Sequence, residues 1–463
     1  MKKLILVFCF ISSIVFSQDN SNVLSFEEYL GYVKKFHPIL KQAQLVSSKG
    51  EAKLLKARGA FDPKIEVDYN RKNFKGTEYY NKLNSTFKIP TWYGIEFKAN
   101  YESNDGVYLN PEFKTPKEGL YSAGVSISLA KGLLTNKRMA SLRQAKLYNQ
   151  QSVQQQKILI NKILFKATNT YFKWLKNHQT KKVYTDYLVN AKIRLQSIKR
   201  SFESGDKPAV DTLEASINYK NRLLDLEKAK IGYIKSKLEA SNYLWLNNDV
   251  PLELTDNVVP DNQTVNLIDE VLTSSITDAV DFNIEDHPKL VKLQLKKKSL
   301  IINKKLKLNN LLPKVDLQYN FLSSDYRSIN SFNNSNYKAG LNVSIPLFLR
   351  KERGDLKLAK IKIKEIDFDI SSTRINLTNK IDGTVQQINS YKEQYNILSN
   401  LVIDYKNLVQ SEERKFSLGE GSLFLVNYRE VKLIENQLKY INTQYKYFIS
   451  KSELLKVLNQ HTL

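Results

Sequence analysis

Apolar and polar residues alternate one by one in several short segments of the chain. The first segment has apolar residues at Ile65, Val67 and Tyr69, and the second has them at Ala123, Val125, Ile127 and Leu129. Because successive side chains of a strand point to opposite faces, this alternation predicts β-strands with one apolar and one polar face. Two later segments, which include Val315 and Leu341, follow the same pattern and predict a second strand pair.

After each strand pair the apolar spacing changes to alternating steps of three and four residues. These positions are Ile160, Leu164, Ala167, Tyr171, Trp174, Tyr184, Leu188, Ala191, Leu195, Ile198 and Phe202, and then Ile381, Val385, Ile388, Tyr395, Leu398, Val402, Tyr405 and Val409. Such spacing is typical of long coiled-coil helices. Each helix is expected to end at a glycine turn, at Gly205 or Gly419, and to be followed by a returning helix. In the first returning helix the apolar residues Ile217, Leu224, Ile231 and Leu238 recur every seven positions.

These elements belong to an internal repeat. His37-Pro38 recurs as His287-Pro288, and residues 62–70 recur as residues 312–320, both at a shift of 250 positions. Residues 121–128 pair with residues 337–344 at a shift of 216, and residues 202–206 pair with residues 416–420 at a shift of 214. The smaller shifts indicate about 34 additional residues in the first half, where Phe87 to Tyr101 predicts an extra hairpin interrupted by Pro90.

The repeat suggests four segments. Residues 1–17 are typical of a signal peptide, because Lys2 and Lys3 precede a short apolar run that small residues follow. Residues 18–246 are interpreted as the first repeat, 247–286 as a linker or equatorial segment, and 287–463 as the second repeat. The single cysteine, Cys9, lies in the predicted signal peptide, so the exported chain is expected to have no disulfide. The residues before Cys9 lack the small side chains that a lipid-attachment site needs.

Composition and charge narrow the function classes. The 463 residues include only 16 Gly and 11 Pro, which excludes a collagen-like chain and permits very long helices. The formal net charge of +24 would favour nucleic acid as a partner in the cytoplasm, but export argues against nucleic-acid binding. The sequence shows no Ser/His/Asp order, phosphate-binding loop or metal-spaced cluster, so it does not indicate an enzyme.

The predicted strands need partners from outside the chain. Two strands in each half cannot close a barrel by themselves. In an exported chain without a later apolar run of 18 residues, a β-barrel shared between several chains leaves no open edge in lipid. Its outer face would be apolar and its lumen polar. The long amphipathic helices should then project away from the membrane as a tube of coiled coils.

The chain resembles the TolC-like outer-membrane efflux proteins from Leu24 to about Leu458. The resemblance rests on the duplicated order of elements, the His-Pro helix starts, the strands led by Pro63 and Pro313, and the paired glycine tips. It implies a mixed α and membrane β-barrel fold with an internal two-fold repeat. In such a fold, three copies share a twelve-stranded barrel, four strands from each, and continue it as a periplasmic coiled-coil tunnel. The hairpin at Phe87 to Tyr101 departs from this pattern. It could lengthen the extracellular cap or add strands.

The resemblance also implies a function without catalysis or cofactor. Such proteins are exit ducts in the outer membrane, embedded in its lipid, for tripartite efflux pumps or type I secretion systems. A homotrimer would work with a periplasmic adaptor (membrane fusion) protein and an inner-membrane transporter that supplies the energy. The alternative is an exported periplasmic coiled-coil scaffold or interaction protein without channel activity. That alternative explains the helices equally well, but it does not explain the strands.

By the resemblance, the helix tips contact the adaptor. The tip residues are Phe202, Gly205, Asp206, Phe416, Gly419, Gly421 and Ser422. Their glycines can equally serve to cap and turn helices, and both roles are compatible. Asp211 and Glu214 are candidates for the entrance constriction or, equally, for a favourable interaction with a helix N-terminal dipole. The equivalent positions after the second tip are Leu425 and Tyr428, so the second repeat is not expected to give an acidic ring.

Two other features have a structural and a functional interpretation. His37 and His287 are repeat-equivalent, but each precedes a Pro at a helix start and lacks Cys or acidic neighbours. We therefore interpret them as structural rather than as metal ligands. Seven lysines between Lys292 and Lys307 crowd one predicted helix. They form a solvated face or, if they line the lumen, give the duct a preference for anions.

Overall fold

The computed structural model describes residues 22–266, 268–272, 279, 281–327 and 334–460. The predicted signal peptide and Cys9 lie outside the described residues. Within the described ranges, no helix combines the length and the apolar character needed to cross a membrane.

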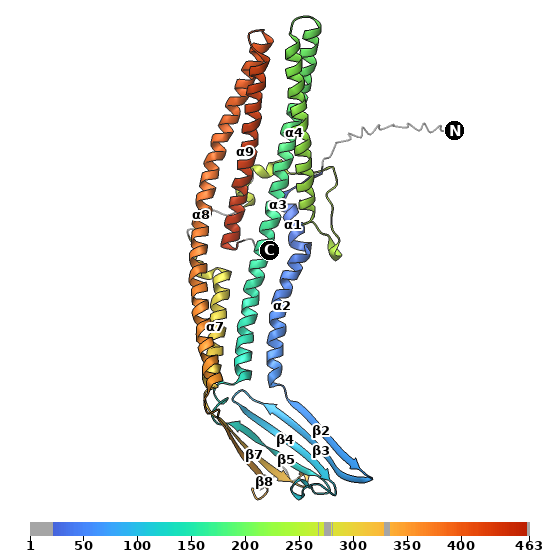
Figure 1. The fold of residues 1–463 in the computed structure, drawn as a ribbon, viewed down its shortest axis with the longest axis vertical. Helices are drawn as coiled ribbons and strands as arrows, with labels where there is room; N and C mark the ends of the chain where they lie inside the picture. Colours follow the sequence, from blue (N-terminus) through green and yellow to red (C-terminus); the bar gives the residue numbers. More distant parts are fainter. Residues whose placement is uncertain (1–21, 267, 273–278, 280, 328–333, 461–463) are drawn as a thin grey trace, which may run out of the picture. The chain divides into compact units, whose positions relative to one another are not determined.

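The elements follow the order that the sequence predicts, and Figure 1 labels most of them. The helices are α1 (Phe26–Phe36), α2 (Pro38–Arg58), α3 (Lys137–Glu203), α4 (Ala209–Ser241), α5 (Ile268–Val271), α7 (Pro288–Asn309), α8 (Arg350–Ser417) and α9 (Leu423–Leu458). The strands are β1 (Asn22–Leu24), β2 (Lys64–Phe74), β3 (Thr77–Pro90), β4 (Ile95–Asp105), β5 (Leu120–Ser128), β6 (Val258–Pro260), β7 (Lys314–Ser323) and β8 (Tyr337–Ser344). The predicted long helices are confirmed, since α3 has 67 residues and α8 has 68.

The described chain forms two compact units. One, here called the tip unit, comprises the described parts of residues 1–38, 164–274 and 386–453. The other, here called the sheet unit, comprises the described parts of residues 39–163, 275–385 and 454–463. α3 and α8 each contribute a segment to both units, because the unit boundaries at residues 163/164 and 385/386 fall inside these helices.

The sheet unit contains a six-stranded antiparallel sheet in the order β2-β3-β4-β5-β7-β8. Pairing of β5 with β7, in which Val125 lies opposite Tyr319, joins the strands of the two repeats. The resemblance implies four strands from each chain, whereas the sheet of this chain has six. The extra hairpin is present as β3 and β4, and it adds two strands because β3 pairs with β2 while β4 pairs with β5.

The two faces of this sheet differ in polarity, as the alternation predicts. In the described register, Val67 lies on β2 opposite Ser85, Phe97 lies on β4 opposite Val125, and Leu317 lies on β7 opposite Leu341. The intervening positions carry polar residues, and Ser128 Oγ donates a hydrogen bond of 2.8 Å to Asp316 Oδ1 across the repeat boundary. One face of the sheet is therefore largely apolar and the other is polar.

The tip unit has an aromatic core. Trp174, Tyr171 and Tyr29 have no exposed surface, and the Phe172 ring packs against Phe26 with ring centroids 5.0 Å apart. Tyr171 Oη donates a hydrogen bond of 2.9 Å to the carbonyl oxygen of Leu24 in β1, which pairs in parallel with β6. Burial raises the pKa of Tyr171 to about 12, so this hydroxyl stays a donor at neutral pH.

The returning helices bury different faces. In α9 the apolar residues Ile434, Ile441 and Phe448 are buried. In α4 the residues that recur every seven positions, from Ile217 to Leu238, are all more than half exposed. The buried face of α4 is formed instead by other residues, among them Ala215, Leu226 and Tyr233. A single chain therefore leaves the large apolar stripe of α4 uncovered.

Candidate functional site

The first tip connects α3 to α4 through a turn at Gly205. Gly205 has φ +85°, a left-handed conformation that residues with a Cβ rarely adopt, and its N–H donates to the Phe202 carbonyl oxygen at 3.0 Å. The Asp206 N–H donates to the Ser201 carbonyl oxygen at 2.8 Å, and Ser204 Oγ donates to Asp206 Oδ2 at 2.8 Å. These bonds close the C-terminal turn of α3 and fix Asp206 at the tip.

The second tip connects α8 to α9 with the same chemistry. Gly419 has φ +82°, and its N–H donates to the Phe416 carbonyl oxygen at 3.2 Å. A Cβ on Gly421 would lie 2.9 Å from the Phe416 nitrogen, so a glycine there lets the turn fold back on α8. Ser422 precedes α9, and its Oγ accepts a hydrogen bond of 3.3 Å from the Leu425 N–H. The tip residue Ser422 therefore caps α9.

The two tips pack against each other. Lys207 Nζ lies 4.8 Å from the centre of the Phe416 ring, and Phe416 also packs against a buried cluster of Ile198, Ala215 and Leu423. Helices α3, α4, α8 and α9 each contribute to this contact. Phe202 is 46% exposed, and a Cβ added to Gly205 or Gly419 would meet no atom within 4 Å apart from those of its chain neighbours. The structure thus brings Phe416 close to the first tip and leaves Phe202 and both turn glycines accessible.

A charged network joins the same four helices next to the tips. Arg194 of α3 donates to Glu413 of α8 at 2.8 Å and to Glu430 of α9 at 3.2 Å. Arg222 of α4 lies 3.7 Å from the other carboxylate oxygen of Glu430. The Glu430 side chain is 1% exposed and that of Arg222 is 7% exposed, so both charges are removed from water. A buried carboxylate between two guanidinium groups is stable only while both partners stay in place.

Sequence reasoning missed this network. Its members flank the apolar seam positions, and charged residues beside a coiled-coil seam are common on solvated helices. The signal in the sequence was the presence of arginines on α3 and α4 and of glutamates on α8 and α9. Such opposite charges indicate a contact only when the helices are known to meet.

The two acidic candidates lie in different environments. Asp211 is in the first turn of α4, where the N-terminal dipole favours a negative charge. Glu214 Oε1 accepts a hydrogen bond of 2.9 Å from Asn427 Nδ2, whose oxygen accepts another of 2.6 Å from Asn218 Nδ2. Glu214 also lines a groove of about 260 Å³ between α4 and α9. A role for either carboxylate at an entrance stays a prediction.

The repeat-equivalent histidines lie inside the protein. His287 is 2% exposed, its Nδ1 accepts a hydrogen bond of 3.1 Å from the Lys289 N–H, and its Nε2 lies 3.0 Å from the Val457 carbonyl oxygen. Burial lowers the pKa of His287 to about 4. His37 ends α1 and stacks on Tyr243 with ring centroids 5.4 Å apart. In the part of the chain that is described, no group of three His, Cys, Asp or Glu side chains is arranged to hold a metal ion.

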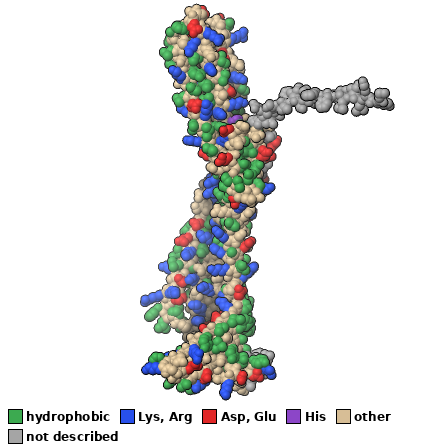
Figure 2. Space-filling view, turned by 90° about the vertical axis from the view of Figure 1, so that its right-hand side faces the viewer, with side chains coloured by type: hydrophobic (Ala, Val, Ile, Leu, Met, Phe, Trp, Pro, Cys, Tyr) green, Lys and Arg blue, Asp and Glu red, His purple; other side chains and the backbone are tan. Residues whose placement is uncertain are grey.

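Some of the lysines of α7 contact neighbouring helices. Lys297 pairs with Asp367 at 2.7 Å, Lys307 pairs with Asp355 at 2.7 Å, and Lys292 donates to Gln155 Oε1 at 2.6 Å. On the face that Figure 2 displays, blue Lys and Arg side chains are distributed over the helices among red acidic ones. This distribution fits the solvated-face interpretation, and the anion preference of a lumen stays a prediction.

Part of the chain matches a known protein family, and its fold is similar to that of several solved structures. Residues 284–460 match the model of the outer membrane efflux protein family. Comparison with curated proteins gives no match. The chain is similar to the CmeC outer membrane channel of Campylobacter jejuni, with a TM-score of 0.65, 14% identity, and coverage of 94% of this chain and 85% of that chain. It is also similar to the outer membrane protein VceC of Vibrio cholerae, with a TM-score of 0.65, 11% identity, and coverage of 94% and 95%.

A third similar structure is the open state of the MtrE outer membrane channel of Neisseria gonorrhoeae, with a TM-score of 0.62, 12% identity, and coverage of 94% of this chain and 88% of that chain. At these identities the structures show the fold, and the family match adds a class of channel proteins rather than enzymes. Together they support the outer-membrane location that the resemblance implies. Residues 284–460 therefore match the outer membrane efflux protein family, and the described chain has the fold of the TolC-like outer-membrane channels.

Proposed function

We propose that this protein is the passive exit duct of a tripartite efflux pump or a type I secretion system. The observation that carries the proposal is a sheet with one apolar and one polar face, joined through long paired helices to glycine tips. The apolar face would contact outer-membrane lipid and the polar face would line the lumen. A periplasmic scaffold would need the helices but would have no use for an exposed apolar sheet face.

We propose that the duct is a homotrimer whose copies cover each other's apolar stripes. On α4 the exposed stripe consists of Ile217, Leu224, Ile231 and Leu238. On α8 a second stripe with the same period consists of Ile361, Phe368 and Ile375, all exposed in one chain. Apolar residues at a constant interval of seven form the seam of a coiled coil, and a seam left open in water needs a partner helix.

The tips are proposed to bind the periplasmic adaptor, and an inner-membrane transporter is proposed to supply the energy. The contact residues would be Phe202, Gly205, Asp206, Phe416, Gly419, Gly421 and Ser422. Open space around Gly205 and Gly419 supports this assignment, because a partner can approach the backbone there without meeting a side chain. The buried pairing of Arg194 and Arg222 with Glu430 would hold the helix ends together until the adaptor binds.

The test is single-channel recording from purified, detergent-solubilised protein in planar lipid bilayers. We expect discrete conductance steps from a trimer. A preference for cations that Asp211→Asn with Glu214→Gln abolishes would assign the entrance to these carboxylates. A preference for anions that survives this double substitution would instead favour the α7 lysines. A water-soluble protein that does not enter lipid would contradict the duct and leave the scaffold.

A further inference from the structure

The hairpin of β3 and β4 changes the size of the barrel that this chain can build. We propose that three copies close an eighteen-stranded barrel, with six strands from each chain, and that its lumen admits bulkier hydrophilic solutes than a twelve-stranded barrel does. This inference rests on the trimer of the proposed function and concerns the width of its membrane part.

The hairpin is a full member of the sheet. The β3–β4 ladder runs from Asn81 opposite Asp105 to Pro90 opposite Glu96 without a shift in register. On one side β3 pairs with β2, where Ile65 lies opposite Phe87, and on the other side β4 pairs with β5, where Phe97 lies opposite Val125. Pro90, which has no N–H, stands at the end of β3, where it does not interrupt the ladder.

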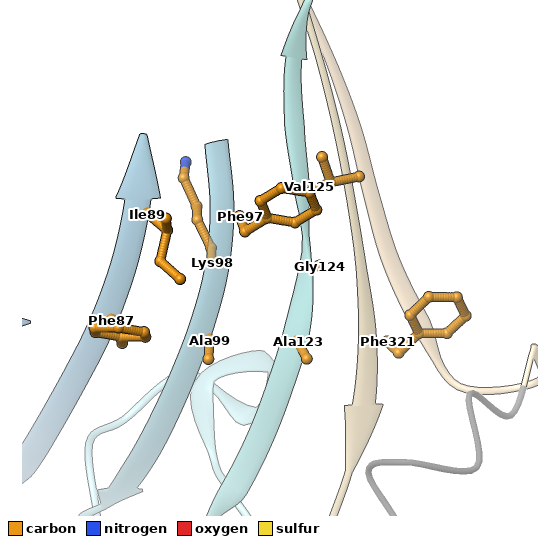
Figure 3. A pocket seen from close by; sticks show the side chains of 9 residues that line it. All are labelled: Phe87, Ile89, Phe97, Lys98, Ala99, Ala123, Gly124, Val125 and Phe321. Atoms are coloured by element: carbon orange, nitrogen blue, oxygen red, sulfur yellow. The ribbon is translucent and has the colours of Figure 1, made fainter. Parts of the chain in front are cut away.

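The apolar face of the sheet continues across the hairpin. Figure 3 shows a hollow lined by Phe87 and Ile89 of β3, Phe97 of β4, Val125 of β5 and Phe321 of β7. The hollow has a volume of about 460 Å³. A hairpin that only extended a cap into water would have no reason to place large apolar side chains in register with lipid-facing strands.

On the polar face, side-chain contacts link the hairpin to β2 and link its own two strands. Glu66 of β2 pairs with Lys88 of β3, and Thr86 Oγ1 of β3 donates a hydrogen bond of 2.6 Å to Asn100 Oδ1 of β4. Asn100 Nδ2 donates in turn to Glu102 Oε1 at 2.7 Å. The hairpin therefore has the same polar inner side and apolar outer side as the strands around it.

The two edges of the sheet can pair with those of other copies and close a barrel. Among the described residues, the outer edges of β2 and β8 have no strand partner, and both strands expose apolar residues such as Val67 and Leu341. An unpaired edge in lipid leaves backbone groups without hydrogen bonds, so each edge needs another copy. In an antiparallel sheet with an even number of strands the two edge strands run in opposite directions. The β2 edge of one copy can therefore pair antiparallel with the β8 edge of the next, and the head-to-tail contact closes into a ring.

The consequence is a wider lumen. Barrel diameter grows roughly in proportion to the number of strands, so eighteen strands give a barrel about 1.5 times as wide as twelve, and about 2.2 times as large in cross-section. Natural barrels of 16–18 strands enclose an aqueous channel. The side chains that face this lumen are small, amide or charged, including Ser126, Asn100 and Lys98, which suits hydrated cargo.

The direct experiment is to image single particles of the detergent-solubilised oligomer and count strands in the barrel. Eighteen strands around a three-fold axis would support the inference. A trimer with twelve strands, in which β3 and β4 lie outside the barrel, would overturn the inference while leaving the exit duct in place. A chain that forms no trimer and no barrel would overturn both.

A chemical test uses neighbouring residues as matched variants. Lys98→Cys places a thiol on the polar face of β4, and Phe97→Cys places one on the apolar face of the same strand. The only natural cysteine is Cys9 in the predicted signal peptide, so the engineered thiol is expected to be the only one in the exported chain. In liposomes, a charged, water-soluble thiol reagent should react with Lys98→Cys and change the channel conductance, and Phe97→Cys should be at least tenfold slower. Equal reaction rates at both positions would overturn the inference, because a hairpin in water exposes both faces.

Discussion

The tip unit and the sheet unit differ in how much of their apolar surface one chain can cover. In the tip unit, Trp174, Tyr171 and Tyr29 are fully buried by residues of the same chain. In the sheet unit, the edge strands expose Ile65 and Leu341, and β4 between them exposes Phe97 on the same apolar face of the sheet. The difference teaches that the tip unit has a buried aromatic core of its own, whereas the sheet and the α4 stripe expose apolar surface that lipid and further copies would cover under the proposed function.

The largest effect should come from breaking the closed core. Trp174→Ala removes a fully buried indole and should lower the free energy of unfolding by about 3–5 kcal/mol. Denaturant unfolding in detergent, followed by near-UV circular dichroism, measures this loss. Leu224→Ala on the α4 stripe is the control, since it should reduce the fraction of trimer and change the unfolding of the dissociated chain by about 0.5 kcal/mol or less. Equal losses in the two variants would contradict the contrast between the units.

The second-largest loss of stability should come from breaking the charged network. Glu430→Ala leaves Arg194 and Arg222 without their shared carboxylate in a buried place, at a cost of about 3 kcal/mol. Glu413→Ala removes a carboxylate that is half exposed, so the loss should be below about 1 kcal/mol. If the network also holds the tips closed, Glu430→Ala should increase the open probability of single channels more than Glu413→Ala does. A Glu430→Ala protein as stable as the parent would show that the pairing contributes nothing.

His287 in the sheet unit should make the free energy of unfolding depend on pH. The neutral His287 ring accepts the Lys289 N–H at Nδ1, and protonation would remove that acceptor. Burial lowers the folded-state pKa to about 4 from the ordinary value of 6.5. The unfolded chain therefore binds the proton more readily, so this stabilisation is complete above pH 6.5 and is lost as the pH falls toward 4.

His287→Asn keeps a side-chain acceptor for the helix cap and cannot titrate in this range. Denaturant unfolding at a series of pH values should show a smaller decrease between pH 6.5 and 4 for this variant than for the parent. The same slope in both proteins would assign the pH dependence to other groups.

The smallest effect on stability should come from replacing the turn glycine Gly205. Gly205→Ala places a Cβ on a residue with φ +85° and should cost about 1–2 kcal/mol. Gly205→Asn should cost less, because Asn adopts the left-handed conformation more readily. Limited proteolysis at the first tip measures the local loosening. An Ala variant as resistant as the Asn variant would show that the tip does not depend on this conformation.

Much of the fold could be predicted from the sequence because its elements are long and strongly periodic. The alternation around Val67 and Val125 predicted the strands, and the 3.5-residue spacing from Ile160 onward predicted α3. The internal repeat gave further support, since the same order of elements appears twice. Gly205 and Gly419 were identifiable because the left-handed turn at a helix end favours glycine.

The candidate site was predictable only in part. The sequence located the tips, but it did not show that Lys207 reaches the Phe416 ring or that Glu430 lies between Arg194 and Arg222. These contacts join residues that are more than 200 positions apart, and no local pattern specifies which helices meet. For the same reason the spacing of Ile217 and Leu224 revealed a stripe without revealing that one chain leaves it exposed.

The sequence by itself determined which segments are strands and helices, where the helices turn, and which face of each strand is apolar. These properties depend on the periodicity of neighbouring residues and on the backbone conformations that each residue allows. The tertiary structure alone decided that the β3–β4 hairpin joins the sheet, raising four expected strands to six, and that four helices share one buried charge network. Strand pairing and helix packing connect distant parts of the chain, so their outcome depends on which surfaces the fold brings together.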